Sequence, residues 1–418
     1  MKRSLLLFLI QISSSVAFFI ATVIVARYLG PEHFGDFSAA YSVASVAYII
    51  CLLGADVTAV NIISMSFKAH QNGVIKAFTI YVFTVVVLLS LVYVVIAIVS
   101  FWVAKDILLL KEIHPVFVAV IFIPFMALAF FFYRVFISLF QPMLANILYK
   151  IIINFSMLLL AMLMFVSEIF RNSYMAVILF MLPWCFAFFI MLVLLVKKVK
   201  LFSVKSERID YKRWLNSGLS GLPYTLVLFT IPYLAIIGAE VFLANEDSVG
   251  IFATAASFSQ LVANNFIACI QSLTLAPIAL AIYQNSMQEV RSIFNKNLIV
   301  MGAISLLLIL ITYIFGEDIL LLYGKKYVVG HNILLIFMIA QSVILTGCLA
   351  APTLLYMGKN KIVATSSISL VFLIVITVSI FGYTFQELGI AFAMLLSVAI
   401  VFVAQSLYAY KLTFESSQ

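Results

Sequence analysis

The sequence predicts an all-α polytopic membrane protein, and three observations support this fold class. Hydrophobic residues make up 66% of the 418 residues and charged residues 10%, against roughly 25% charged residues in a typical soluble domain. Apolar residues continue through stretches of about 20 residues, which is the length that crosses the hydrocarbon core as a helix. These stretches do not alternate with period two, which excludes a transmembrane β-barrel.

Twelve stretches of the chain are long and apolar enough to be transmembrane helices. They cover approximately residues 5–26, 35–58, 75–103, 115–138, 144–166, 173–196, 218–242, 249–274, 293–315, 332–356, 362–383 and 388–410. The start of the chain, Met1-Lys2-Arg3 followed by apolar residues, looks like a signal peptide. Because the apolar run continues to Ala26, it is too long for one, and we expect a retained first helix.

The basic residues predict the orientation of these helices. With the N-terminus in the cytoplasm, 18 of the 24 lysines and arginines fall on the inner side. The six on the outer side are Arg27, Lys105, Lys111, Arg171, Lys325 and Lys326. Cytoplasmic loops carry an excess of basic residues, so we expect both termini in the cytoplasm. The net charge of +8 therefore reflects the membrane and does not indicate a nucleic-acid partner.

The longest connection lies near the middle of the chain and divides it into two parts. Residues 197–217 carry seven basic residues and only two acidic ones, Glu207 and Asp210, which is typical of a cytoplasmic linker near anionic headgroups. We therefore expect a six-helix lobe over 1–196, the basic linker over 197–217 and a second six-helix lobe over 218–418. No outer loop is long enough for a catalytic domain, and we expect no enzymatic activity.

The two halves show signs of an internal duplication. The segment GDFSAAYS (35–42) aligns with GIFATAAS (250–257), and DILLL occurs at 106–110 and again at 318–322. Since each half has an even number of helices, both cross the membrane in the same sense, as in a parallel repeat. Two such lobes suggest a transporter whose cleft opens to either face and holds the substrate between them.

Several segments resemble one family of transporters. ARYLGPEHFGDFSAAYS (26–42) is similar to the first outer loop and second helix of the polysaccharide transporter family, the Wzx-type flippases of the MATE-like MOP superfamily. The second half adds DSVGIFATAAS (247–257), LLLYGKKYVVGHNILLIF (320–337) and PTLLYMGKNKI (352–362). One departure is that Phe242 stands where the first half has Arg27, so the two lobes are not chemically equivalent.

The resemblance implies a fold, a substrate and a location. It implies the MATE-like architecture and the transfer of an undecaprenyl-diphosphate-linked oligosaccharide, an O-antigen repeat unit of lipopolysaccharide or a similar polysaccharide, from the cytoplasmic to the periplasmic leaflet. The location would be the bacterial inner membrane. The expected partners are this lipid-linked glycan, membrane lipids and the polysaccharide polymerase machinery.

Polar side chains gather on one face of two predicted spans. In the second span, Ser38, Tyr41, Ser45, Tyr48 and Asp56 fall within an arc of about 80°, and in the eighth, Ser257, Gln260, Asn264 and Gln271 fall within about 60°. Such groups can bind sugar hydroxyls in a wet cavity, and tyrosine rings can stack on sugars. The alternative is that they only join helices. We predict that Tyr41, Ser45, Gln260, Asn264 and Gln271 line the cavity.

Charged residues inside the spans are stronger candidates, because each costs about 2.5–3.5 kcal/mol at a helix centre. Arg27 ends the first span, and Arg134 and Lys150 lie near the inner ends of the fourth and fifth. They either snorkel to the headgroups or line the cavity and hold the diphosphate, for which arginine is well suited. Asp56 is a candidate for coupling transport to a proton or sodium gradient.

Other functions and ligands are less well supported. A MATE-like exporter of drugs or cations would need acidic residues deep in a lobe, where only Asp56 qualifies, and a polysaccharide polymerase or ligase would need a large outer loop. The four cysteines lack metal-ligand spacing, and the four histidines (His33, His70, His114 and His331) lie at span ends or in loops. We therefore expect no metal, no cofactor and no catalytic residues.

Overall fold

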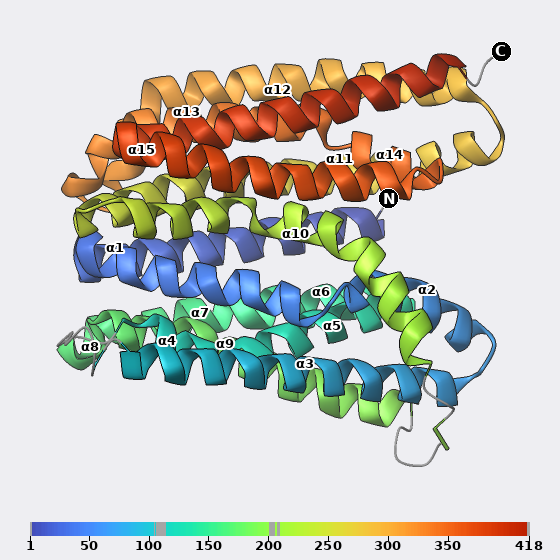
Figure 1. The fold of residues 1–418 in the computed structure, drawn as a ribbon, viewed down its shortest axis with the longest axis horizontal. Helices are drawn as coiled ribbons and strands as arrows, with labels where there is room; N and C mark the ends of the chain where they lie inside the picture. Colours follow the sequence, from blue (N-terminus) through green and yellow to red (C-terminus); the bar gives the residue numbers. More distant parts are fainter. Residues whose placement is uncertain (1, 104, 106–113, 200–204, 207–209, 416–418) are drawn as a thin grey trace. The chain divides into compact units, whose positions relative to one another are not determined.

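A computed structural model of the chain describes residues 2–103, 105, 114–199, 205, 206 and 210–415. These residues form helices joined by short turns, with no strand among them (Figure 1). This confirms the predicted fold class. The first DILLL segment (106–110) and residues 200–204 and 207–209 of the predicted linker lie outside the described residues.

The number of apolar helices agrees approximately with the twelve predicted spans. Nine helical stretches of the described residues are long and apolar enough to cross a membrane. Two of them, Leu6–Cys51 and Asn360–Phe414, contain a break and so hold two spans each. The pair formed by α4 (Val116–Val120) and α5 (Ile123–Ser138) supplies a shorter crossing.

The chain divides into two compact units. The first unit comprises Met1–Leu29 and Asp36–Tyr233, and the second comprises Gly30–Gly35 and Leu234–Gln418. The boundary at Tyr233 lies inside α10 (Tyr211–Phe242), whereas the predicted lobes were separated by the linker. The lobe assignment stays a prediction.

The first unit contains the helices of the N-terminal half. They are α1 (Lys2–Cys51), α2 (Ala55–Lys68), α3 (Asn72–Trp102), α4, α5, α6 (Pro142–Asn146), the π-helix η2 (Ile147–Ile151), α7 (Ile152–Ala161), α8 (Leu163–Val166), the 3₁₀-helix η3 (Glu168–Phe170), α9 (Ser173–Val199) and the first part of α10. Pro124 stands in the first turn of α5, where a missing N–H costs no helical hydrogen bond.

A helix break in the first unit interrupts the predicted second span. Leu53 and Gly54 adopt φ values of 45° and 73° between α1 and α2. A Cβ on Gly218 of α10 would collide with the Leu53 carbonyl oxygen, and one on Gly54 would collide with the Gly218 carbonyl. The two glycines therefore permit a close crossing. The prediction that Asp56 shares one helical face with Tyr41 is wrong, because the break ends the regular 100° rotation.

The second unit is built from the remaining helices. After α10 come α11 (Glu246–Tyr283), α12 (Met287–Leu321), the 3₁₀-helix η4 (Lys325–Gly330), α13 (His331–Gly347), α14 (Ala350–Tyr356) and α15 (Asn360–Glu415). Gln386 has φ 52° and divides α15 into two helices, in agreement with the predicted gap between 383 and 388. Both α12 and α15 pack against α13.

A six-residue segment of the N-terminal half, Gly30–Gly35, belongs to the second unit. Gly30 has φ 74° and breaks α1. A Cβ on Gly250 of α11 would overlap the carbonyl oxygen of Pro31, so only glycine fits this contact. The Phe34 ring packs edge-on against Tyr327, with 6.1 Å between ring centroids. The aligned glycines of the predicted repeat, Gly35 and Gly250, thus lie at one backbone crossing.

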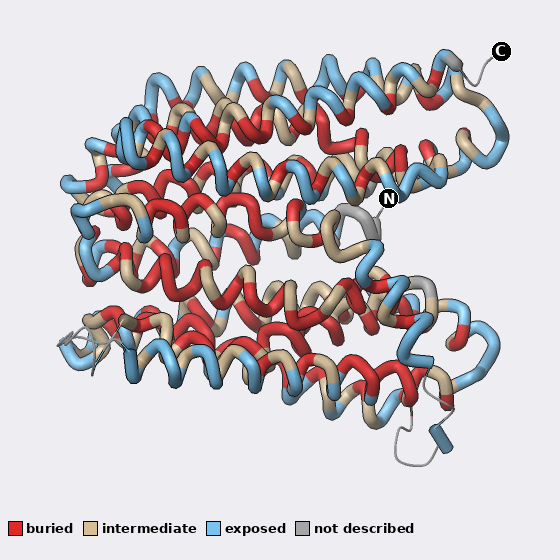
Figure 2. Tube along the Cα trace, viewed as in Figure 1, coloured by how far each residue is buried: buried red, intermediate tan, exposed pale blue. Residues whose placement is uncertain are grey.

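Burial follows the pattern of a membrane protein. Figure 2 shows that exposed positions recur along the length of α3 and α12, and many of them are apolar, for example Val95, Leu306 and Ile314. In a chain with this composition, exposed apolar side chains contact lipid and not water. The buried positions include four of the five phenylalanines of α5, and Phe131 and Phe136 among them are fully buried.

The glycine crossing of the first unit can be tested with Gly218→Ala. The added methyl group meets the Leu53 carbonyl, and overpacking typically costs about 1–3 kcal/mol, so we expect a lower melting temperature in detergent. The matched control is Gly302→Ala on α12, where a Cβ has no neighbour within 4 Å. That change is expected to leave stability unchanged or to raise it by up to about 1 kcal/mol. Equal melting temperatures for the two variants would contradict the crossing.

Candidate functional site

Aromatic side chains fill the interior of the first unit. The tyrosine cluster consists of Tyr41, Tyr48, Tyr133, Tyr149, Tyr233 and Trp184. The rings of Tyr133 and Tyr149 are stacked, with centroids 4.5 Å apart and planes inclined by 24°. Trp184 packs on both Tyr149 (5.5 Å) and Tyr48 (5.9 Å). The cluster therefore joins α1, α5, η2 and α9.

Phe130 of α5 is the apolar centre of this cluster. Its ring lies 5.8 Å from that of Tyr48 and 5.7 Å from that of Tyr149, and it also contacts Phe229 of α10 at 5.3 Å. A tyrosine exposes an apolar ring and a polar hydroxyl, which needs a partner when buried. The Tyr48 and Tyr149 side chains interact electrostatically with each other.

Ser45 and Tyr41 extend the cluster along α1. The Ser45 hydroxyl is buried and interacts electrostatically with Tyr233 of α10. Tyr41 packs against the Tyr233 ring at 6.1 Å and against Phe180 at 6.5 Å. The hydroxyl of Ser42, one residue on, is buried and has no hydrogen-bond partner among the described residues. Tyr41 and Ser45 lie about one helical turn apart on α1.

Lys150 lies in the π-helical turn η2, beside the stacked Tyr149. Its ammonium donates a hydrogen bond to Oε1 of Gln11 on α1, and the Ser14 hydroxyl donates to its backbone carbonyl (3.1 Å). Asn154 Nδ2 in turn donates to the Ser14 hydroxyl (2.8 Å). A π turn displaces the regular backbone hydrogen bonds and is frequent at functional sites. Here Ser14 of α1 donates the hydrogen bond that the Lys150 carbonyl accepts.

Asp56 is the most deeply buried carboxylate in this part of the structure, with 1% of its surface exposed. It stands in the first turn of α2, where the helix dipole favours a negative charge. Its Oδ2 accepts a hydrogen bond from Thr225 Oγ1 of α10 at 3.4 Å. Its Oδ1 has no hydrogen-bond partner among the described residues.

Arg134 of α5 is the basic residue that interacts electrostatically with Asp56. Its side chain is half-buried, and its Nε is buried without a hydrogen-bond partner in the part of the chain that the structure describes. A guanidinium has five N–H donors, so an N–H group of Arg134 that has no partner among the described residues can donate a hydrogen bond to a ligand oxygen. Arg134 directly follows Tyr133, just as Lys150 follows Tyr149.

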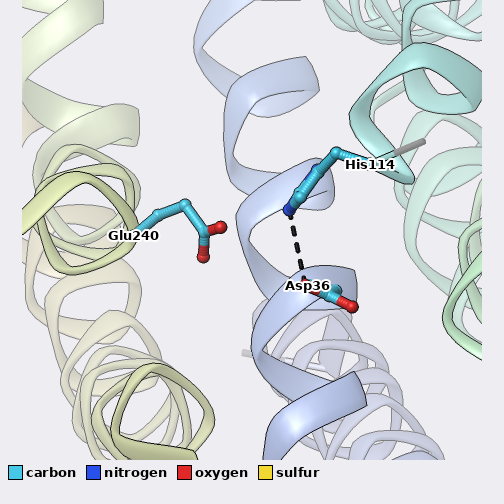
Figure 3. Close-up of side chains that lie close together, drawn as sticks. All are labelled: Asp36, His114 and Glu240. Atoms are coloured by element: carbon cyan, nitrogen blue, oxygen red, sulfur yellow. Dashed lines mark ion pairs between the residues drawn. The ribbon is translucent and has the colours of Figure 1, made fainter. Parts of the chain in front are cut away.

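A second polar group in the first unit joins three of its helices. His114 Nε2 lies 3.5 Å from Asp36 Oδ1 (Figure 3), and Ser173 Oγ donates to Asp36 Oδ2 at 3.3 Å. The Val116 backbone N–H donates to His114 Nδ1, so the other ring nitrogen carries the proton that faces Asp36. Glu240, also drawn in Figure 3, belongs to the second unit. This group connects the start of α4 and of α9 to α1.

The structure brings five of the nine predicted site residues into the interior of the first unit. They are Tyr41, Ser45, Asp56, Arg134 and Lys150. Arg27 is exposed and lies elsewhere on α1. It is 16 residues beyond Gln11, the partner of Lys150, which is about 24 Å along a helix. Arg27 and Lys150 therefore do not share one binding site in the first unit.

The other three predicted residues lie on α11 in the second unit. Asn264 is exposed, while Gln260 and Gln271 are half-buried. The Gln271 amide donates a hydrogen bond to the Cys348 carbonyl (3.2 Å), at the turn between α13 and α14. This hydrogen bond therefore gives the Cys348 carbonyl a partner where the helix is interrupted between α13 and α14.

Sequence reasoning did not find the aromatic part of the site. Tyr133, Tyr149 and Trp184 lie on three different spans, and helical periodicity relates residues of one span only. One signal was present: the pairs Tyr133-Arg134 and Tyr149-Lys150 each place a tyrosine before a basic residue near one end of a predicted span. The histidine interaction was also missed, because His114 was judged only from its position at a span end.

The chemistry of this interior suits a polar, anionic ligand with ring faces. Lys150 and Arg134 provide positive charge, the tyrosines provide hydroxyls and flat apolar surfaces, and Ser42 and Ser45 provide further hydroxyls. Charge-assisted hydrogen bonds to phosphate oxygens are roughly twice as strong as neutral ones. The same interior contains one buried carboxylate, Asp56, which is the group that a cation would use.

Comparison with known proteins gives a fold relationship. No known family profile matches the sequence, and no curated protein sequence matches it. Several solved structures share the fold. A multidrug resistance MATE family transporter of the MOP superfamily, in an inward-facing conformation, superposes with a TM-score of 0.75 at 13% identity, covering 98% of this chain and 99% of that one.

Two further structures extend the relationship. The lipid II flippase MurJ in its inward closed conformation matches with a TM-score of 0.70 at 15% identity, covering 97% of this chain and 87% of MurJ. A MOP superfamily transporter from Pyrococcus furiosus matches with a TM-score of 0.62 at 12% identity, covering 99% and 95% of the two chains. The chain therefore has the fold of MOP superfamily transporters and is a multi-pass membrane protein.

The interaction between Asp56 and Arg134 can be tested with a double-mutant cycle. Asp56→Asn and Arg134→Gln each remove one of the two interacting charges, and a single substitution of this kind typically costs about 0.5–3 kcal/mol. We expect the double variant to lose less stability than the two single losses added together, by about 0.5–3 kcal/mol. Thermal unfolding of the detergent-purified protein measures this, and the exposed Glu289→Gln is the control. Additive losses would show that the two charges do not interact.

Proposed function

From the MOP fold and the basic, tyrosine-rich interior of the first unit, we propose that the protein is a flippase for a polyprenyl-diphosphate-linked oligosaccharide. The proposed reaction moves the glycan head group from the cytoplasmic to the periplasmic leaflet of a bacterial inner membrane. The substrate is the undecaprenyl-diphosphate-linked repeat unit of O-antigen or a similar surface polysaccharide.

One observation carries this proposal. Two cationic side chains, Arg134 and Lys150, each follow one ring of the stacked Tyr133–Tyr149 pair. Phosphate oxygens are bound by guanidinium and ammonium groups, and sugar rings stack on aromatic faces while their hydroxyls bond to polar tips. A diphosphate joined to a sugar needs both kinds of group together. The Gln11 amide holds the Lys150 ammonium and so fixes its position.

The proposed task of the protein is to speed up the passage of the head group across the membrane. A glycan and a diphosphate cannot enter hydrocarbon unless their hydrogen bonds to water are replaced, because each unsatisfied polar group costs several kcal/mol there. The interior groups of the first unit would replace them, while the polyprenyl chain stays in the bilayer. In alternating access, these groups face first one side of the membrane and then the other. Both termini would lie in the cytoplasm.

The second candidate function is export of a cation or a cationic drug, and Asp56 is the observation that favours it. A buried carboxylate can bind a cation, and multidrug transporters share the fold. Arg134 opposes this reading, because it already interacts with Asp56 and its positive charge repels a second cation. In the flippase proposal, Asp56 would couple transport to a proton gradient, because protonation neutralises the carboxylate and adds no second cation beside Arg134.

The remaining predicted site residues belong to this proposal as secondary contacts. Gln260 and Asn264 of α11 would bind glycan hydroxyls, and Arg27 would act at the outer end of the path. Gln271 already donates to a backbone carbonyl, so its part would be to hold α11 in position. Transfer of the flipped repeat unit to the polysaccharide polymerase machinery would follow.

The proposal is tested in a deletion strain of the source bacterium. We expect loss of the surface polymer and retention of complete repeat units on the polyprenyl lipid, which mass spectrometry of extracted lipids measures. Re-expressed Lys150→Gln and Arg134→Gln should restore transport poorly, at roughly a tenth of the wild-type rate or less, because a hydrogen bond to a charged group contributes about 1.5–3 kcal/mol.

Two controls separate binding from folding. Lys150→Arg keeps the charge and should retain more activity than Lys150→Gln, whereas the exposed Lys361→Gln should be as active as wild type. Membrane levels of each variant are measured in parallel. Normal surface polymer in the deletion strain, together with new sensitivity to cationic compounds, would reject the flippase and favour the exporter.

A further inference from the structure

A groove on the second unit lies between α12, α13 and α15, separate from the tyrosine cluster. Its volume is about 430 Å³, within the range of about 300–1,000 Å³ that is common for small-molecule sites. Its apolar lining residues are Phe294, Leu298, Val343, Phe402, Val403 and Leu407. Leu298, Val403 and Leu407 are 58%, 49% and 66% exposed. The groove therefore opens toward the lipid.

The floor of the groove depends on a glycine. Gly347 ends α13, and a Cβ there would lie 3.1 Å from Ser406 Oγ and 3.3 Å from Phe402 Cδ1. A larger side chain at this position would fill the space between α12 and α15. Both of these helices pack on α13. The glycine therefore leaves the groove open, with α12 and α15 as its sides and α13 as its floor.

The groove has a polar end, where α12 begins and α15 ends. Asn295 and Tyr410 line it there. The Arg291 guanidinium donates a hydrogen bond to the Thr413 carbonyl at 2.9 Å and lies over the Phe414 ring, which shows that the two helix ends are neighbours. Lys411 directly follows the lining residue Tyr410. Two basic residues therefore stand at this end, and Glu289 is the acidic residue in the first turn of α12.

The length of the groove fits one leaflet. Its lining residues on α15 run from Phe402 to Tyr410, which is about 12 Å of helix at 1.5 Å per residue. One leaflet contributes about 15 Å of hydrocarbon, half of the bilayer core. An elongated apolar chain can therefore lie along α15, with its polar head at the end that carries Arg291 and Lys411.

From this geometry we propose that the groove binds one acyl chain of an anionic phospholipid, whose phosphate lies beside Arg291 and Lys411. The apolar lining matches a hydrocarbon chain, and the basic end matches a negatively charged head group. Tyr410 and Asn295 provide hydroxyl and amide groups at the level of the ester and phosphate oxygens. The site is separate from the proposed transport residues, so the proposal does not depend on the flippase function.

Native mass spectrometry of the full-length protein in detergent tests the site, with phosphatidylglycerol as the anionic probe and phosphatidylcholine as the zwitterionic one. We expect the wild type to retain phosphatidylglycerol preferentially. Val403→Trp places a large ring in the groove and should weaken phosphatidylglycerol binding at least tenfold. Ile400→Trp is the matched control, since Ile400 is also on α15, is equally exposed at 49% and lies outside the lining residues.

The head-group contact is tested separately with Lys411→Gln. A basic residue near a membrane surface contributes about 1 kcal/mol to anionic lipid binding, so the preference for phosphatidylglycerol over phosphatidylcholine should fall about fivefold. Lys325→Gln, at the start of η4, should leave it unchanged. Equal binding by the Val403→Trp and Ile400→Trp variants, or equal binding of the two lipids by the wild type, would overturn the proposal. So would a dimer that Val403→Trp dissociates, because a second copy would then occupy the groove.

Discussion

The need to satisfy backbone hydrogen bonds inside hydrocarbon governs this structure. A helix pairs its N–H and C=O groups within one segment, which is why the described residues are almost entirely helical. Every departure from the helix then needs a substitute partner. The Ser14 hydroxyl donates a hydrogen bond to the Lys150 carbonyl at the π turn, and the Gln271 amide donates one to the Cys348 carbonyl between α13 and α14. At Leu53, Gly54 in the turn before α2 and Gly218 of α10 allow a close approach instead.

This constraint also determines where charge can be placed. Asp56 is buried, but it occupies the first turn of a helix and faces Arg134 across the interior of the first unit. Lys150 is held by a glutamine amide on α1. Each charge thus has a polar neighbour. Arg134 Nε and Asp56 Oδ1, however, make no hydrogen bond to the described residues and can still bind a ligand or water. In a water-excluded interior, such capacity is costly without a ligand or water.

Much of the fold followed from composition and apolar periodicity, because lipid imposes the same length and hydrophobicity on every span. The breaks at Gly30 and Gln386 lay where two predicted spans met. The break at Leu53 could not be predicted, since the apolar run continues through it and its cause, the close approach of Gly218, comes from a helix more than 150 residues later. Tyr133, Tyr149 and Trp184 of the tyrosine cluster were missed for the same reason: Tyr133 and Tyr149 stack only once α5 and η2 are packed together.

The site predictions were also limited by what the sequence shows of packing. Of the residues chosen because a charge is costly in lipid, Asp56, Arg134 and Lys150 lie in the interior of the first unit, whereas Arg27 is exposed. Gln271 was chosen because an amide is polar, but it bonds to a backbone carbonyl. A sequence shows that a polar group needs a partner, and only the packed structure shows whether that partner is the protein itself.

The short segment Gly30–Gly35 has a consequence for biosynthesis. It leaves the ribosome with the first helix, yet Phe34 packs on Tyr327 and Pro31 packs on Gly250, residues that are made some 200–300 positions later. The second unit therefore cannot complete its packing from its own contiguous sequence. A gene split at the central linker would produce a C-terminal fragment without this piece, so the two halves of the chain are not independent modules.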